Sequence, residues 1–276
     1  MRISVNGGEC YAYTGFHRLD PAQPTIAFVH GAANDHSVWA LQSRYFAHHG
    51  FNVLAVDLPA HGRSAGEAFA TVEAIADWIP ALLDAAGVAQ AALVGHSLGS
   101  LAVLACAARH PERVASIALI GPAAPMLVSD ELLAAARDDE LLAYEMIVGW
   151  SISAARQLGG NTVPGMWMTG SALRLMERTR PGVLHSDLTA CQSYGNGLVD
   201  AAAVRCPVLA VVGGRDQMTP VKGARALLDT LAGVRVVTLQ GAGHAMMAEQ
   251  PDAVLDALRT FLQASPRRQM HRALPR

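Results

Sequence analysis

The sequence has no marked excess of charge of either sign: 21 Lys and Arg residues stand against 23 Asp and Glu residues, and the formal net charge is −2. This balance gives no electrostatic reason to expect a nucleic acid or an anionic membrane as partner. The start of the chain, MRISVNGGECYAYTG, lacks the apolar core of a signal peptide, and no stretch approaches the ~18 uninterrupted apolar residues of a membrane span. We therefore predict no nucleic-acid partner, no membrane partner and a cytoplasmic location.

Closely spaced cysteines are also missing. The four cysteines are scattered along the chain, at Cys10, Cys106, Cys191 and Cys206. Metal sites and redox motifs use close pairs of cysteines. We expect four free thiols, no bound metal and no cofactor.

Hydrophobic residues, in contrast, make up 51% of the 276 residues, which indicates a globular chain. Continuous apolar runs suit strands of a parallel sheet that is buried on both faces. These runs lie at residues 25–31, 52–59, 91–96, 114–121, 207–214 and 234–241, with helical patterns at about 70–86, 98–109, 221–232 and 251–263. The alternation predicts an α/β fold with a doubly wound, mostly parallel sheet. The stretches RISVN and CYAYTGF predict an antiparallel hairpin at its edge.

The alternation breaks over residues 122–205, where helical patterns occur without a strong strand. We predict a helical cap here, inserted into a core formed by residues 1–121 and 206–264, with residues 265–276 as a frayed tail. The cap is rich in Met and Trp, most of which we expect to pack cap helices together. Trp150 and Trp167 are candidates for contact with a substrate.

A serine between two glycines follows the apolar run at 91–96, in the stretch LVGHSLGS. Gly95 and Gly99 flank Ser97 at a strand-to-helix transition, where a sharp turn needs room for strained backbone and close helix packing. This geometry predicts that the hydroxyl of Ser97 stands at the carboxyl end of the sheet, where open α/β sheets bind ligands.

A serine needs a base to remove its proton, and the base needs a third group to hold it in the right tautomer. The run at 207–214 is followed by RDQMTP, which contains Asp216, and the run at 234–241 by AGHAMMAEQP, which contains His244. The end of the run at 114–121 is another place where the acid of such a group could stand, but the nearest acid after it is Asp130. We predict that Ser97, Asp216 and His244 form a catalytic triad in that chain order.

On these residues the chain resembles an α/β-hydrolase with a helical cap, over about residues 1–264. HGAANDHSVW at 30–39 and DLPAHGRS at 57–64 are similar to two further segments of that family, although Ala60 stands where many members have glycine. The resemblance implies an oxyanion hole made by the backbone N–H groups of Ala32 and Leu98. His96 and Met246, next to the nucleophile and the base, are further candidates for substrate contact.

Family members differ in chemistry. A serine nucleophile differs from the aspartate of haloalkane dehalogenases and epoxide hydrolases, and Gly-His-Ser differs from the Gly-Asn-Ser of many carbon-carbon bond hydrolases. Our leading hypothesis is a carboxylic-ester hydrolase that acts through an acyl-enzyme on Ser97, with a small to medium, partly apolar, ester-like substrate. The alternatives are a lactonase, a thioesterase, a carbon-carbon bond hydrolase, a cofactor-free peroxidase-like enzyme, or a non-catalytic ligand-binding homologue.

Overall fold

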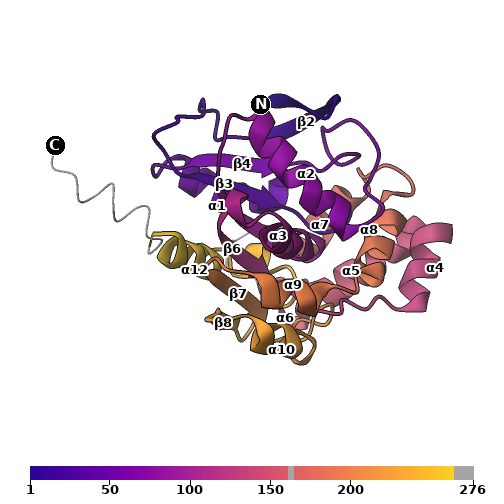
Figure 1. Ribbon diagram of the computed structural model, residues 1–276. Coiled ribbons are helices and arrows are strands. Elements are labelled where there is room, and N and C mark those ends of the chain that lie inside the picture. The colour runs from indigo at the N-terminus through magenta and orange to yellow at the C-terminus, as the bar shows by residue number, and fades with distance from the viewer. Residues whose placement is uncertain (161–164, 264–276) are drawn as a thin grey trace.

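An eight-stranded sheet runs through the computed structural model, which describes residues 1–160 and 165–263 (Figure 1). Its strand order is β1-β2-β4-β3-β5-β6-β7-β8. The strands are β1 (Arg2–Val5), β2 (Gly8–Tyr13), β3 (Thr25–Val29), β4 (Asn52–Val56), β5 (Ala91–His96), β6 (Val114–Ile120), β7 (Val208–Gly213) and β8 (Arg235–Leu239). The predicted frayed tail at 265–276 lies outside the described residues.

The sheet is parallel from β4 through β8, and β1 and β2 add to its edge as an antiparallel hairpin. Every residue of β3, β4 and β7 is buried, as expected for strands that helices cover on both faces. The predicted α/β class, the doubly wound, mostly parallel sheet and the edge hairpin are therefore confirmed.

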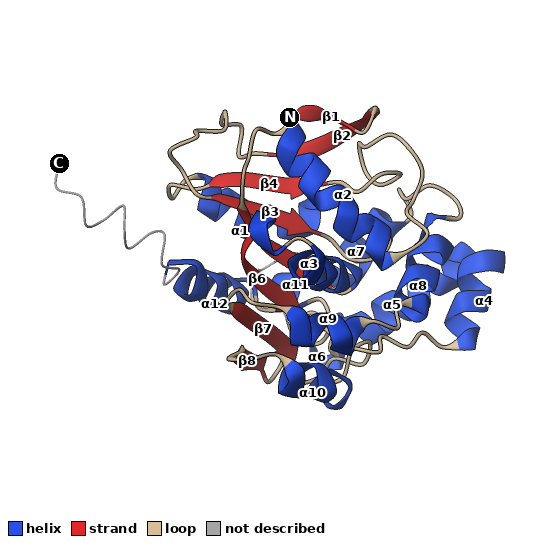
Figure 2. Ribbon diagram, viewed as in Figure 1, coloured by secondary structure: helices blue, strands red, loops and turns tan. Residues whose placement is uncertain are grey.

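Helices cover both faces of the sheet (Figure 2). One face packs against α2, α3, α9 and α10, and the other against α1, α11 and α12. The helices are η1 (His36–Trp39), α1 (Ala40–Ala47), α2 (Val72–Ala85), α3 (Leu98–Arg109), η2 (Pro111–Arg113), α4 (Asp130–Asp138), α5 (Glu140–Ser151), α6 (Ala154–Gln157), α7 (Met168–Met176), α8 (Val183–Ser193), α9 (Gly197–Ala203), α10 (Val221–Thr230), α11 (Met246–Glu249) and α12 (Pro251–Gln263). None of the helices in the described part of the chain is long and apolar enough to cross a membrane.

Between β6 and β7 the described residues form the helices α4 to α9 and no strand. Helices α4, α5, α7 and α8 share an apolar core with Ala33, Met218 and Ala245, which lie in loops after β3, β7 and β8. These helices therefore lie over the carboxyl ends of the strands. Helix α9 packs instead on α3 and α10, in the layer that covers the sheet. Helix α8 also contacts α3, so the predicted cap boundaries at 122 and 205 enclose two helices that contact the core layer.

The four cysteines are free, and all but Cys206 are fully buried. Burial raises the pKa of the Cys10 thiol to about 11 and that of the Cys106 thiol to about 12. Both groups therefore stay protonated at neutral pH, and they pack as small apolar side chains.

Candidate active site

Ser97 sits between the last residue of β5 and the first residue of α3, with φ of +53° and ψ of −119°. A non-glycine residue in this region stores about 1–3 kcal/mol of strain. The flanking glycines make the turn possible. A Cβ on Gly95 would lie 2.1 Å from the carbonyl oxygen of Gly99, and one on Gly99 would lie 2.3 Å from that of Val29. The strained serine between two obligatory glycines is the arrangement of a nucleophile elbow.

His244 and Asp216 meet at the carboxyl ends of β7 and β8. His244 Nδ1 lies 2.8 Å from Asp216 Oδ2, and both side chains are almost completely buried. Burial alone raises the pKa of Asp216, but the neighbouring His244 and the hydrogen bonds from His244 and Thr219 outweigh it and lower that pKa to about 2. Asp216 is therefore a carboxylate at neutral pH that accepts the Nδ1–H of His244, which leaves Nε2 of that ring able to accept a proton.

The sequence reasoning missed Thr219, which belongs to the same cluster. Its hydroxyl lies 2.8 Å from Asp216 Oδ2 and 3.1 Å from His244 Nδ1, and its backbone N–H donates to Asp216 Oδ1 at 2.8 Å. The signal was present in RDQMTP, where Thr219 follows the acid by three residues. Asp130, the other acid considered, lies exposed at the start of α4.

Ser97 and His244 line one cavity of about 800 Å³, a size within the usual range of ligand pockets. Its walls come from the ends of the strands and from the cap. Ala32 lines the same cavity. A Cβ on the adjacent Gly31 would lie 3.1 Å from the Cβ of Ser97, so this loop runs directly beside the candidate nucleophile. The N–H of Leu98 is the first of α3, and the first N–H groups of a helix have no partner within it. The geometry suits the predicted oxyanion hole.

The candidate substrate contacts divide into two groups. His96 and Trp150 line the cavity, whereas Trp167 and Met246 are absent from its lining. Trp167 is 69% exposed, and Met246 is fully buried close to Gly121 and His244. Trp167 and Met246 therefore do not form part of this cavity wall. The sequence pattern does not encode these positions, because the direction of the Trp167 side chain depends on cap packing and Met246 packs into the core on one face of the sheet.

His96 has a second role besides lining the cavity. Its Nε2–H donates to the carbonyl oxygen of His244 at 3.0 Å, and the two rings lie 4.6 Å apart between centroids. Burial, together with the nearby His244, lowers the pKa of His96 to about 3. His96 is thus a neutral ring that holds the backbone of the candidate base.

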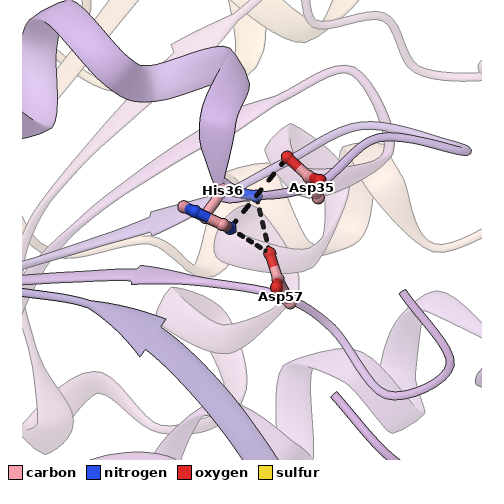
Figure 3. Close-up of side chains that lie close together, drawn as sticks. All are labelled: Asp35, His36 and Asp57. Carbon is pink, nitrogen blue, oxygen red and sulfur yellow. Dashed lines mark hydrogen bonds and ion pairs between the residues drawn. The ribbon is translucent and has the colours of Figure 1, made fainter. Parts of the chain in front are cut away.

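Asp35, His36 and Asp57 form a cluster whose spacing would suit a metal ion (Figure 3). Hydrogen bonds within the protein already explain why these side chains lie together. Asp57 Oδ1 accepts from the backbone N–H and from Nδ1 of His36, both at 2.7 Å, and Oδ2 accepts from the N–H of Arg63 at 2.9 Å. Asp35 caps η1 through the N–H of Ser37. We interpret this cluster as a brace between the loops after β3 and β4.

Comparisons with known proteins agree with this geometry. The model of the alpha/beta hydrolase fold family matches residues 24–251. The pimeloyl-[acyl-carrier protein] methyl ester esterase of Neisseria meningitidis serogroup C is 31% identical over 253 residues, which cover 89% of this chain and 96% of that protein. The protein of the same name from Chromobacterium violaceum is 31% identical over 248 residues, with coverages of 87% and 94%.

Solved structures give the same result. The enol-lactonase from Burkholderia xenovorans LB400 has a TM-score of 0.84 at 25% identity, with 95% of this chain and 100% of that chain covered. The esterase from Exiguobacterium antarcticum has a TM-score of 0.82 at 16% identity, with coverages of 96% and 99%, and shows likeness of fold alone. The chain therefore belongs to the alpha/beta hydrolase fold family, as an esterase-like hydrolase.

Proposed function

We propose that this protein hydrolyses carboxylic esters through an acyl-enzyme on Ser97. The observation that carries the proposal is that a strained serine and His244, which is paired with the buried Asp216, line one cavity. Structural histidines and serines are common, but they do not combine with an elbow at the carboxyl end of a parallel sheet.

In the proposed mechanism, Ser97 Oγ attacks the ester carbonyl carbon while His244 Nε2 takes the hydroxyl proton. The N–H groups of Ala32 and Leu98 donate to the oxyanion, and each such donor is worth about 3 kcal/mol of barrier. The tetrahedral adduct then collapses, and His244 gives its proton to the departing alcohol. Water repeats these steps on the acyl-enzyme and releases the acid. Asp216 holds His244 in the required tautomer throughout.

The cavity supports an acyl group that is mostly apolar. Its lining includes Met126, Leu132, Val148, Trp150, Met168 and Leu188 from the cap and the segment leading into it. The relatives named above are methyl ester esterases, which favours an ester of a small alcohol. The likeness to an enol-lactonase makes a lactone the second candidate substrate.

A fluorophosphonate probe tests the nucleophile without any assumption about the natural substrate. We expect one adduct per chain by intact mass, located on Ser97 by peptide mapping, and no adduct in Ser97→Ala. Ser171→Ala is the matched control, because Ser171 lines the same cavity outside the elbow. An adduct that persists in Ser97→Ala contradicts the proposal.

The substrate class is tested with methyl and p-nitrophenyl esters of graded acyl length, beside a lactone and a thioester. We expect the highest kcat/KM for an ester of medium acyl length, and we expect no turnover of any ester by Ser97→Ala. A preference for the lactone at equal carbon number would select the second candidate, and no turnover of any ester by a phosphonate-reactive protein would overturn the ester assignment.

A further inference from the structure

A buried acid in the cap reaches the loop beside the candidate nucleophile. Asp187, on α8, is 3% exposed. Its Oδ2 accepts from the backbone N–H of Ala33 at 2.9 Å and lies 2.9 Å from His61 Nε2. These partners come from the loops after β3 and β4. One carboxylate oxygen of the cap therefore joins two loops of the core.

His61 pairs with the side chain of Asp187. His61 Nδ1 lies 2.9 Å from the carbonyl oxygen of Pro59, which can only accept, and Nε2 faces the carboxylate. A neutral imidazole has one N–H, so two acceptors require the doubly protonated ring. Burial by itself lowers the pKa of His61, but the Asp187 carboxylate and the hydrogen bonds outweigh it and raise that pKa.

Ala33 is held by the cap through both of its backbone groups. Its N–H donates to Asp187, and its carbonyl oxygen accepts from the hydroxyl of Thr179 at 3.1 Å. Ala33 is fully buried and has φ of +51°, a conformation that an alanine adopts only when its surroundings hold it there. The preceding residue, Ala32, lines the cavity, and its carbonyl oxygen accepts from the side chain of Asn34 at 2.9 Å.

We propose that Asp187 is a positioning residue: its hydrogen bond to the N–H of Ala33 holds the loop at residues 31–34 so that the N–H of Ala32 points at the reacting oxyanion. This inference rests on the proposed function, in which Ala32 is one of the two oxyanion donors. Through Asp187 the cap takes part in rate as well as in binding, because an oxyanion donor acts mainly in the transition state.

The expected effect is large because donor geometry is strict. A misplacement of about 1 Å can cost about 100-fold in rate, and losing one oxyanion donor costs about 100- to 1,000-fold in kcat. Asp187→Leu keeps the shape of the side chain and removes both oxygens. We expect it to lower kcat by about 10- to 100-fold and to change KM less than about threefold.

Asp187→Asn is the matched variant, because it loses the charge but keeps an oxygen that can accept from the N–H of Ala33. We expect it to stay within about fivefold of the wild-type kcat. The rate of phosphonylation of Ser97 by a small fluorophosphonate is measured on the same variants, since that reaction also places a negative oxygen in the hole. Thermal unfolding of each variant shows how much of the protein is folded.

Two results would overturn the inference. The first is a folded Asp187→Leu variant with wild-type kcat and a wild-type rate of phosphonylation. The second is an Asp187→Asn variant as slow as Asp187→Leu, because the effect would then come from the lost charge. If Asp187→Leu does not fold, Thr179→Val replaces it, because it removes the hydrogen bond to the carbonyl oxygen of Ala33. We expect phosphonylation of Ser97 to be three- to tenfold slower in Thr179→Val. A wild-type rate would refute the inference. A wild-type protein that fails to react at Ser97 contradicts the proposed function instead, so the two failures are distinguishable.

Discussion

At the scale of single residues, the hydroxyl of Thr219 is a third member of the Asp216–His244 cluster. It lies within 3.1 Å of both members and also of the carbonyl oxygen of Gly121. Two backbone N–H groups, of Met218 and Thr219, donate to Asp216 Oδ1. The carboxylate thus has several donors besides the imidazole, and its position does not depend on His244 alone.

We therefore expect Asp216→Asn to fold and yet to lower kcat by up to ~10⁴, because an amide favours the wrong tautomer of His244. Thr219→Val keeps the shape and removes one hydrogen bond, so we expect a loss of only about tenfold. The measurement is kcat for the best ester, with circular dichroism as control. Near-wild-type turnover by Asp216→Asn would place the acid elsewhere.

At the scale of elements, the cap is fastened to the loops that carry the candidate catalytic groups. The carbonyl oxygen of Ser151, at the end of α5, accepts from the N–H of His244 at 2.7 Å and from that of Ala245 at 3.0 Å. Glu249 Oε1 accepts from the N–H of Gly243, and the same carboxylate holds Ser153 of the cap. Helix α5 of the cap therefore contacts the loop that carries His244, as α8 contacts the loop at 31–34.

Two tryptophans of the cap provide a matched pair for a specificity test. Trp150, on α5, lines the cavity, whereas Trp167 is 69% exposed and lies outside the lining. We expect Trp150→Ala to shift the preferred ester towards longer acyl chains and to change KM, while phosphonate labelling of Ser97 stays within about threefold. Trp167→Ala should change neither the ester preference and KM nor the labelling of Ser97. A folded Trp150→Ala that loses both activities equally would mean that the cap does not act as a separate specificity element.

The part of this structure that local patterns determine could be predicted from the sequence. The apolar run at 114–121 becomes β6 (Val114–Ile120), and the pattern at 98–109 becomes α3 (Leu98–Arg109). Ser97, Asp216 and His244 could be proposed together because each follows a strand, and parallel strands bring their carboxyl ends to one edge.

Contacts between distant segments could not be predicted in this way. Asp187 meets Ala33 only because α8 folds back over the sheet, and nothing in the residues around Asp187 marks it as different from an ordinary surface acid. The exposure of Trp167 depends likewise on how α7 packs. Such contacts need the three-dimensional arrangement of the cap, for which the helical periodicity of each segment is not enough.

At the scale of the whole molecule, three of the buried histidines have pKa values that fold-dependent contacts shift in opposite directions. Burial lowers the pKa of His30 to about 4, and burial with the neighbouring His244 lowers that of His96 to about 3. His61 behaves differently, because Asp187 raises its pKa despite burial. An unfolded histidine titrates near 6.5. The first two rings are thus neutral in the fold, whereas the third keeps its proton to a higher pH than an unfolded histidine does.

The sign of the pH dependence follows from these shifts. Between about pH 6.5 and pH 4 the unfolded chain binds protons at His30 and His96 that the folded chain does not, so stability falls as pH falls, by at most roughly 3 kcal/mol per pH unit. His61 contributes stability that is complete below about pH 6.5 and is lost as pH rises through its folded pKa. Urea unfolding between pH 7 and 5 measures the slope, which His96→Gln should flatten. Stability that is constant over this range would contradict the neutral state of the two rings.

The order in which the strands occur along the chain has a consequence for biosynthesis. Ser97 follows β5, whereas Asp216 and His244 follow β7 and β8, with the whole cap between them. Translation at 5–20 residues per second places on the order of ten seconds between the serine and the histidine. During that interval a ribosome-bound chain holds the proposed nucleophile without its base. Hydrolysis by the proposed triad can therefore begin only after synthesis has passed β8 and His244.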